Sequence, residues 1–353
     1  MLKKILIVGL GGIGQRHVRN IRQLLGKNAD LIAYRQRSLS HVINAQLKID
    51  DRKTVEEEYD IRVFTNLDEA LSEKPDIALI CNPSKFHLEI ALKAANAGCH
   101  LFIEKPLSDS IVDVEHLINT VQQNGLIAMV GYQMRYHPCI IRLQEILASN
   151  LIGNLLSVTA QIGEYLPDWH PYEDYRKMYA ARADLGGGVV LSQIHECDYL
   201  YALFGLPSQV FAMGGHWSHL EIDVEDTASA LMRFFYHERD LPVYLHQDYL
   251  QRPARRTCEI IGDRAHVVAD LRAVTVTLTE EDGHTTVNNY DGFDRNELFL
   301  AEMRHFLNCV ENKEKPIVDL YMGLQSLRMA LAIKKSITTR NVVALNAEAA
   351  FNE

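Results

Sequence analysis

The chain has 353 residues, of which 47% are hydrophobic and 23% are charged, a composition typical of a globular protein long enough for two domains. Its formal net charge is −10, which argues against nucleic acid or an anionic membrane as a general partner, because both need a basic surface. Its apolar runs are all shorter than the roughly 18 residues that span a bilayer. The six cysteines are scattered without a C-x-x-C pair, so we expect reduced thiols and a cytoplasmic protein.

The first third of the chain alternates short apolar segments with amphipathic ones. Between the apolar segments, hydrophobic residues recur every three or four positions, as they do in helices. This alternation predicts a parallel sheet covered on both faces, a doubly wound Rossmann α/β domain over residues 1–130. The predicted strands are 5–9, 31–34, 77–81, 101–103 and 127–130.

Residues 131–353 have a different pattern, with strands in series and helices before and after them. Such an order predicts an α+β domain with a large, mostly antiparallel, open-faced sheet. A helix-like stretch runs to Phe204, and a second one carries the apolar stripe from Leu298 to Val310. The predicted strands are 155–162, 209–213, 227–235, 243–249, 257–261, 266–270 and 274–278.

The glycine-rich segment at residues 9–14, Gly-Leu-Gly-Gly-Ile-Gly, follows the first predicted strand and opens the first predicted helix. In G-x-G-x-x-G loops the first glycine permits a tight turn, the second lets the backbone approach a pyrophosphate, and the third lets helix and strand pack closely. The N–H groups at the start of the helix then bind the phosphates. The alternative is a glycine turn without a ligand. We predict cofactor contacts from Gly9, Gly11, Gly12, Ile13 and Gly14.

The end of the second strand bears on which nicotinamide cofactor is bound. NAD sites usually place a carboxylate there for the ribose 2′-hydroxyl, about 20 residues after the glycines. This chain instead has Tyr34, Arg35, Arg37 and Ser38. Either arginine can pair with a 2′-phosphate, and Tyr34 or Arg35 can stack on the adenine. The sequence therefore favours NADP, with NAD as the alternative; without a cofactor role these residues form a solvated basic turn.

Two polar turns follow the third and fourth predicted strands, where open α/β sheets bind ligands. The first turn contains Asn82-Pro83 and then His87, and the second, residues 104–106, reads Glu-Lys-Pro. With the glycine loop before them and residues 131–136 after them, these motifs resemble the Gfo/Idh/MocA family, the relatives of glucose–fructose oxidoreductase and inositol dehydrogenase. The resemblance covers essentially the whole chain.

The resemblance implies a catalytic role for the lysine of the Glu-Lys-Pro triplet. An ammonium near the reacting carbon can hydrogen-bond a hydroxyl or carbonyl group and stabilise developing negative charge. The alternative is a surface lysine before a helix. The cofactor contacts that the resemblance implies in this part of the chain are Asn82, Pro83, His87, Glu104, Lys105 and Gln133.

A second glycine run, residues 186–188, leads into a helix that carries His195. It looks like the family segment that carries a catalytic histidine, and an imidazole can take the proton of a sugar hydroxyl as hydride leaves. Asp198, one helical turn later, is predicted to orient this histidine. The sequence departs from the family at Ser192, because many members have an aspartate three or four residues before the histidine. The alternatives are a packed helix histidine or a metal ligand, but the i, i+4 histidine pair of a zinc helix is missing, so we expect no metal.

The segment 163–176 combines aromatic rings with hydrogen-bonding groups, a mixture that suits a sugar. The alternative is a folded loop that buries its own rings. The predicted substrate contacts are Arg135, Tyr165, Trp169, Arg176, Ser192, His195 and Asp198.

These features together predict a nicotinamide-dependent oxidoreductase. It would move hydride between NAD(P) and a hydroxyl or carbonyl carbon of a sugar, sugar acid or nucleotide-linked sugar. Because family members often assemble through the open sheet, we expect a homodimer or homotetramer. The alternatives are a dinucleotide-binding regulatory protein with weak catalysis, which the Ser192 departure motivates, and a biliverdin-reductase-like imine or enone reductase.

Overall fold

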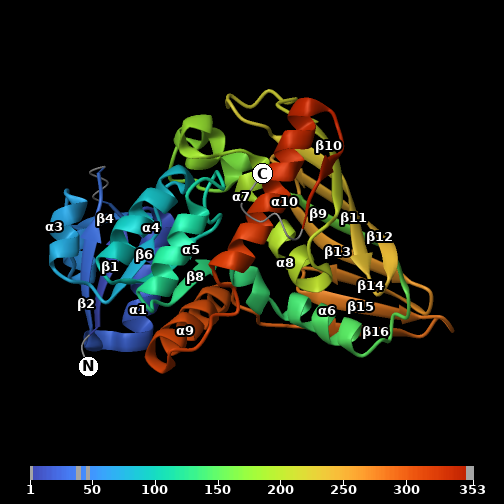
Figure 1. The fold of residues 1–353 in the computed structure, drawn as a ribbon, viewed down its shortest axis with the longest axis horizontal. Helices are drawn as coiled ribbons and strands as arrows, with labels where there is room; N and C mark the ends of the chain where they lie inside the picture. Colours follow the sequence, from blue (N-terminus) through green and yellow to red (C-terminus); the bar gives the residue numbers. More distant parts are fainter. Residues whose placement is uncertain (1–2, 37–40, 45–47, 347–353) are drawn as a thin grey trace.

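The computed structural model describes residues 3–36, 41–44 and 48–346, which form two large sheets side by side, with helices around and between them, and one small two-stranded sheet (Figure 1). In this part of the chain, no helix is long and apolar enough to cross a membrane. All six cysteines are buried and unpaired.

The N-terminal sheet has six parallel strands in the order β5-β2-β1-β6-β7-β8. This is the doubly wound arrangement that the sequence predicted, and its direction of growth reverses between β1 and β6. Helices α1 (Gly12–Leu25), α4 (His87–Asn96) and α5 (Val114–Gln123) pack beside it. The strands are β1 (Lys3–Val8), β2 (Ala29–Tyr34), β5 (Arg62–Phe64), β6 (Ile77–Ile80), β7 (His100–Glu104) and β8 (Ala128–Gly131).

A small hairpin between β2 and β5 was not predicted. It consists of β3 (His41–Ile43) and β4 (Ile49–Thr54), and it is followed by the short helices α2 (Val55–Tyr59) and α3 (Leu67–Ser72). The hairpin is attached to α1 by Gln15, whose Oε1 accepts a hydrogen bond from the Ile43 N–H at 2.7 Å. This insertion therefore lies against the helix that the glycine loop opens.

The C-terminal domain contains a nine-stranded sheet in the order β16-β15-β14-β13-β9-β12-β11-β10-β17. Its neighbouring strands are antiparallel except for the parallel pair β9–β12, so the prediction of a mostly antiparallel sheet is confirmed. The strands are β9 (Leu155–Gly163), β10 (Gln209–Gly215), β11 (Thr227–Tyr236), β12 (Arg239–Asp248), β13 (Arg255–Gly262), β14 (Ala265–Asp270), β15 (Thr275–Glu280), β16 (Thr285–Asn289) and β17 (Val343–Ala344).

One face of this sheet is covered by α6 (Pro138–Ala148), α7 (Val189–Ser192), α8 (His195–Phe204) and α10 (Leu320–Thr339) (Figure 1). Residues alternate between buried and exposed along β10 and β11, as expected for a sheet with one solvated face. Large apolar side chains nevertheless lie on the exposed face. They are Phe211, Met213, Leu231, Phe235 and Tyr244, which we call the open-face patch.

The long helix α9 (Asn296–Asn312) returns to the N-terminal sheet and packs on α1 (Figure 1). Its residues Met303, Phe306 and Leu307 share a buried cluster with Ile5 and Phe102 of the parallel strands. The core under the glycine loop is therefore completed by residues from the far end of the chain.

Candidate active site

The glycine loop has the geometry that its spacing predicts. Gly9 has a φ of +92°, and its N–H donates to the Tyr34 carbonyl at 2.9 Å. A side chain on Gly14 would lie 2.0 Å from the Gly9 carbonyl oxygen, so only glycine fits where helix and strand meet. A side chain on Gly11 would meet no atom within 4 Å, so the backbone there faces open space. This arrangement leaves the start of α1 open to a phosphate-bearing ligand.

Two side chains that follow strands of the parallel sheet have buried polar atoms without a hydrogen bond. Asn82 lies beside Gly9 at the end of β6, and its Oδ1 is buried without a hydrogen bond. Gln133, in the turn after β8, has a buried Oε1 in the same condition. Because buried polar atoms are nearly always hydrogen-bonded, such orphans mark a place where a ligand completes the bonding. The residues at this edge of the sheet therefore fit a dinucleotide.

His87 lies between the two polar turns. Its Nδ1 lies 2.9 Å from the Pro106 carbonyl oxygen and its Nε2 lies 2.8 Å from the Asn82 carbonyl oxygen. Both ring nitrogens thus face backbone, and burial lowers the pKa of the imidazole. His87 therefore joins the two polar turns to each other, and its predicted contact with the cofactor stays a prediction.

The end of β2, where the sequence predicts that the adenosine binds, lies beside a carboxylate that sequence reasoning missed. Arg35, directly after β2, donates a hydrogen bond to Glu56 of α2, and their side chains are 15% and 35% exposed. The Tyr34 hydroxyl accepts a hydrogen bond from Gln36 at 2.9 Å. The predicted contacts Arg37 and Ser38 lie outside the described residues. The charge of Arg35, on which the NADP argument rests, is therefore partly balanced by Glu56.

Lys105 reaches from the end of β7 to the C-terminal domain. Its Nζ donates to the carbonyl oxygen of Ser192 at 2.7 Å, and the Lys105–Pro106 peptide bond is cis. The next helix, α8, begins at His195. The two predicted catalytic residues, at the end of β7 and the start of α8, are therefore brought near each other from positions 90 apart in the sequence.

His195 is 6% exposed, and neither of its ring nitrogens has a hydrogen-bond partner among the described residues. Burial holds its pKa well below the usual value, and the positive charges of Lys105, Arg256 and Arg295 add to the effect. The imidazole is thus neutral at pH 7 and free to accept a proton. The nearby Ser192 hydroxyl is also buried without a partner.

Glu104 of the Glu-Lys-Pro triplet is held by α1. Its Oε1 lies 2.6 Å from Nε2 of the fully buried His17. Lys105 follows this carboxylate directly, so the His17–Glu104 contact fixes the strand end from which Lys105 extends. The predicted cofactor contact of Glu104 stays a prediction.

Asp198 does not orient His195. Its carboxylate is fully buried and accepts hydrogen bonds from Arg135 at 2.6 and 2.9 Å and from the Ser326 hydroxyl at 3.2 Å. Arg135 and Asp198 are therefore an internal ion pair, and their predicted contacts with the substrate stay predictions. Glu196, two positions before Asp198, pairs with Arg256 at 2.7 Å, so each of these two carboxylates faces an arginine.

The aromatic segment is partly occupied by internal contacts. Arg176 is half exposed and hydrogen-bonds Asp174 and Glu221 at 2.8 Å each, and its predicted contact with the substrate stays a prediction. The ring of Tyr165 lies 3.8 Å from the Arg252 guanidinium. Trp169 packs edge-on against Tyr249, but its indole N–H is buried without an acceptor. Of these residues, Trp169 thus keeps an open hydrogen-bonding position.

Two glutamines beside His195 were missed. Gln193 donates to the Asp248 carbonyl at 3.0 Å, and Gln247 donates back to the Gln193 carbonyl at 2.8 Å. Each leaves its own Oε1 buried and unpartnered. The position of Gln193 two residues before His195 could have identified it, whereas nothing local marks Gln247.

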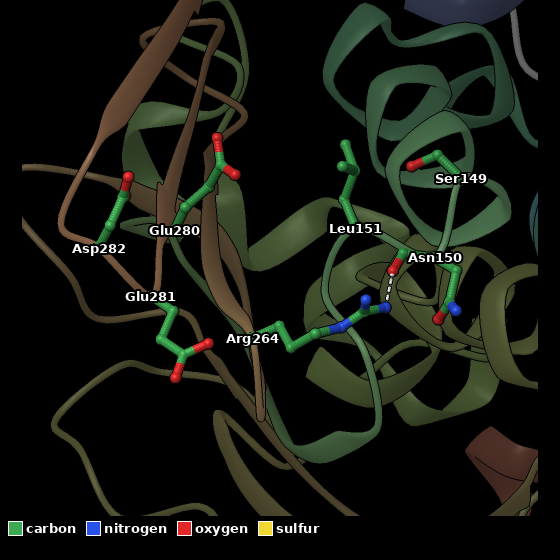
Figure 2. Close-up of a pocket in the computed structure, with 7 residues that line it drawn as sticks. All are labelled: Ser149, Asn150, Leu151, Arg264, Glu280, Glu281 and Asp282. Carbon is green, nitrogen blue, oxygen red and sulfur yellow. Dashed lines mark hydrogen bonds between the residues drawn. The ribbon is translucent and has the colours of Figure 1, made fainter.

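A surface pocket of about 550 Å³ lies elsewhere, between the end of α6 and the turns that follow β13 and β15 (Figure 2). Figure 2 shows Arg264 bonded to the Asn150 carbonyl across it, with three acidic side chains opposite. None of the predicted site residues lines this pocket. The candidate active site is therefore the junction of the two sheets.

Comparisons with known proteins match both parts of the chain. The profile described as "Oxidoreductase family, NAD-binding Rossmann fold" matches residues 3–132, and the "GFO/IDH/MocA C-terminal domain" matches residues 140–268. The myo-inositol 2-dehydrogenase of Thermotoga maritima is 28% identical over 97% of this chain and 98% of its own length. The D-glucoside 3-dehydrogenase of Escherichia coli is 22% identical over 78% of this chain and 81% of its own.

Solved structures show the same fold. The WlbA dehydrogenase from Bordetella pertussis, in complex with NADH and UDP-GlcNAcA, has a TM-score of 0.79 at 21% identity and covers 98% of this chain and 99% of its own. Levoglucosan dehydrogenase with NADH and levoglucosan has a TM-score of 0.81 at 16% identity, with the same coverage. The paired matches to both parts of the chain, together with the loop and site geometry above, show that this chain belongs to the Gfo/Idh/MocA family of NAD-binding oxidoreductases.

Proposed function

We propose that the protein moves hydride between a nicotinamide cofactor and a hydroxyl-bearing carbon of a sugar, sugar acid or nucleotide-linked sugar. The observation that carries this proposal is the meeting of Lys105 with the segment that holds His195, through the 2.7 Å contact with the Ser192 carbonyl. The class of substrate is supported by the relatives, whose names include an inositol, a glucoside and a complex with a UDP-linked sugar acid.

The roles of the residues follow from their environment. The nicotinamide, when bound, supplies the hydride acceptor. His195 is neutral because of burial and nearby cations, so it takes the hydroxyl proton as the carbon is oxidised. Lys105 stabilises the negative charge that grows on the substrate oxygen. Ser192 cannot act as a carboxylate base, but its unpartnered hydroxyl can hold a substrate hydroxyl in place.

We propose that the chain is divided into two functional domains near residue 130. Residues 1–130 hold the cofactor, and residues 131–353 bind substrate and form the assembly. The helix α9 is the exception, because it packs on α1 although it belongs to the second segment.

We propose NAD(H) as the preferred cofactor of the site as described. The NADP preference inferred from the sequence stays a prediction, and Arg35 supports it. Glu56 opposes it, because its carboxylate would repel a 2′-phosphate that shared the same guanidinium. The NADH complexes of the structural relatives agree with NAD(H).

The proposed activity is tested by following NAD(P)H fluorescence with a panel of substrates. The panel contains neutral cyclic polyols, glycosides, sugar acids and UDP-linked sugars, together with imine and enone acceptors. Turnover of a panel sugar that is lost in Lys105→Ala supports the proposal. Tight NADH binding without turnover of any sugar would favour the regulatory alternative, and reduction of imine or enone acceptors alone would favour the reductase alternative.

We further propose a homo-oligomer that covers the open-face patch with a second copy of the chain. Met213, Leu231 and Phe235 are 61%, 56% and 65% exposed, and an apolar patch of this kind is costly to leave in water. Sedimentation should show a dimer or tetramer that Leu231→Arg dissociates. A monomer at all concentrations in the unmodified protein would refute this arrangement.

We also propose a cytoplasmic location. The six thiols are all buried and free, and burial raises the pKa of Cys99, Cys139 and Cys258 to about 12. Unpaired cysteines are typical of a reducing compartment. Cell fractionation with an antibody against the chain tests this location.

A further inference from the structure

Residues 163–185, which we call the strap, cross from the large sheet to the cofactor loops (light green in Figure 1). The strap begins where the Glu164 N–H donates to the Asp248 carbonyl at 3.1 Å. At its far end the Ser84 hydroxyl, beside the Asn-Pro turn, donates to the Leu185 carbonyl at 3.3 Å and to the Gly186 carbonyl at 3.1 Å. The strap is therefore fixed at both ends, on different sheets.

The middle of the strap places Tyr172 against the glycine loop. A methyl group on Gly12 would lie only 2.5 Å from the Tyr172 hydroxyl oxygen, which is too close for a normal contact. The same methyl group would lie 4.0 Å from Ile43, an ordinary contact distance. Gly12 is the first residue of α1, the position where a dinucleotide loop approaches its phosphates. The hydroxyl of a residue from the C-terminal domain thus lies at the phosphate end of the cofactor site.

The Tyr172 hydroxyl is available to donate a hydrogen bond to a ligand beside Gly12. It has no hydrogen-bond partner among the described residues. The ring is held by stacking on His170, at 5.2 Å between ring centres and 16° between planes, and His170 bonds Glu173 at 2.8 Å. Burial raises the pKa of Tyr172 to about 12, so the phenol keeps its proton at neutral pH. The nearby Arg16 charge favours an anion at the same place.

We propose that Tyr172 is a cofactor-binding residue supplied by the strap, and that its hydroxyl donates a hydrogen bond to a phosphate oxygen of the bound dinucleotide. The strap then closes over the cofactor from the substrate side, so that the two parts of the chain grip the same ligand. This inference rests on cofactor binding at the glycine loop and not on the proposed sugar substrate.

The test is the binding of ADP-ribose, which carries the pyrophosphate but no nicotinamide. Tyr172→Phe keeps the ring and removes only the hydroxyl, and it should raise the Kd for ADP-ribose roughly tenfold, the usual effect of losing one hydrogen bond to a charged group. Titration calorimetry measures this without any turnover, so a wrong substrate class leaves the test readable. Unchanged or tighter binding by Tyr172→Phe would overturn the proposal, since it would mean that the hydroxyl obstructs the site or lies outside it.

A matched control separates the hydroxyl contact from the order of the strap. Tyr175→Phe makes the same chemical change three residues away, where the hydroxyl accepts a hydrogen bond from the Glu221 N–H at 3.2 Å inside the C-terminal domain. It should change the Kd for ADP-ribose by less than about twofold, within the range of a lost exposed hydrogen bond. An equal loss in both variants would show that the affinity depends on strap order alone and would also overturn the proposal.

A second pair of variants tests the location. Gly12→Ala places a methyl group on the Tyr172 hydroxyl and should displace the strap. Once the strap is displaced, Tyr172→Phe should have little further effect, so the two changes should be non-additive in ADP-ribose binding. Full additivity would place the Tyr172 hydroxyl away from Gly12 in the bound state and would contradict the proposed contact.

Discussion

Replacing Glu56 by glutamine removes the carboxylate that faces Arg35 and keeps the side chain's size. In the described structure the two side chains form a hydrogen-bonded ion pair at the end of β2, next to the Gly9–Tyr34 contact. Glutamine can still accept a hydrogen bond from the guanidinium, so the arginine stays in place while the local charge changes by one unit. We expect Glu56→Gln to shift the cofactor preference toward NADP(H).

The size of the shift follows from charge and distance. A 2′-phosphate that shared the Arg35 guanidinium with Glu56 would lie roughly 6 Å from the carboxylate and carry about −1.5 to −2 charges. Because the Glu56 side chain is 35% exposed, water screens the pair. With an effective dielectric constant of about 60, the repulsion is roughly 1.5 kcal/mol. Its removal should therefore tighten NADPH binding about tenfold and leave NADH binding nearly unchanged.

The assay is the ratio of the Kd values for NADPH and NADH, measured by fluorescence at low and high salt. Glu58→Gln is the control, because Glu58 lies on the same helix but pairs with the exposed Lys53 at 3.1 Å. The shift should be confined to Glu56→Gln and should shrink at about 0.5 M salt, where the Debye length falls below the separation. An unchanged ratio, or an equal shift in Glu58→Gln, would refute the view that Glu56 controls the charge at this position.

Three further expectations concern the site and its titration. Lys105→Met should lower kcat by at least about 100-fold with an NADH Kd within about threefold, because it removes charge stabilisation and spares the glycine loop; retained turnover would remove Lys105 from the mechanism. The acid limb of kcat/KM should lie well below pH 6.5, not near neutrality, because burial and Lys105 lower the pKa of His195. In Lys105→Met the acid limb of any residual rate should move to a higher pH, because the positive charge is gone. In His195→Gln the limb should disappear. Burial also lowers the pKa of His137 to about 4, so between pH 6.5 and pH 5 the imidazole is protonated in the unfolded state but not in the folded state. This difference should reduce the free energy of unfolding by about 1.5 kcal/mol as the pH falls from 6.5 to 5. Urea titrations should show a smaller decrease in His137→Gln.

The sequence predicts site residues best where they belong to a short motif that directly follows a strand. The glycine loop, the Asn82-Pro83 turn and the Glu-Lys-Pro triplet each follow a buried strand, and a parallel sheet brings strand ends to one edge. Their common location follows from the fold class alone. The hairpin β3–β4 was missed because β4 is polar and mostly exposed, so it has no apolar periodicity to detect.

The remaining errors concern pairs of residues that meet only in the folded chain. Asp198 is 63 positions from Arg135, and its spacing from His195 gave a plausible but wrong partner. A warning sign was present, because an aspartate between Cys197 and Tyr199 in an apolar helix requires a countercharge. The contact of Tyr172 with Gly12 has no such sign in the sequence. A glycine at position 12 is already explained by the glycine-rich loop, so it does not indicate a residue packed against it.

During synthesis the strands of the cofactor sheet leave the ribosome long before α9. Until Met303 and Phe306 arrive, the apolar side chains of Ile5 and Phe102 on one side of that sheet lack their final cover. Residues 1–130 are therefore a poor segment to exchange between related proteins, because that segment contains only the sheet side of the contact between the sheet and α9. A functional graft has to move two distant stretches of the chain together, and a chimera that moves only one should expose apolar surface and aggregate.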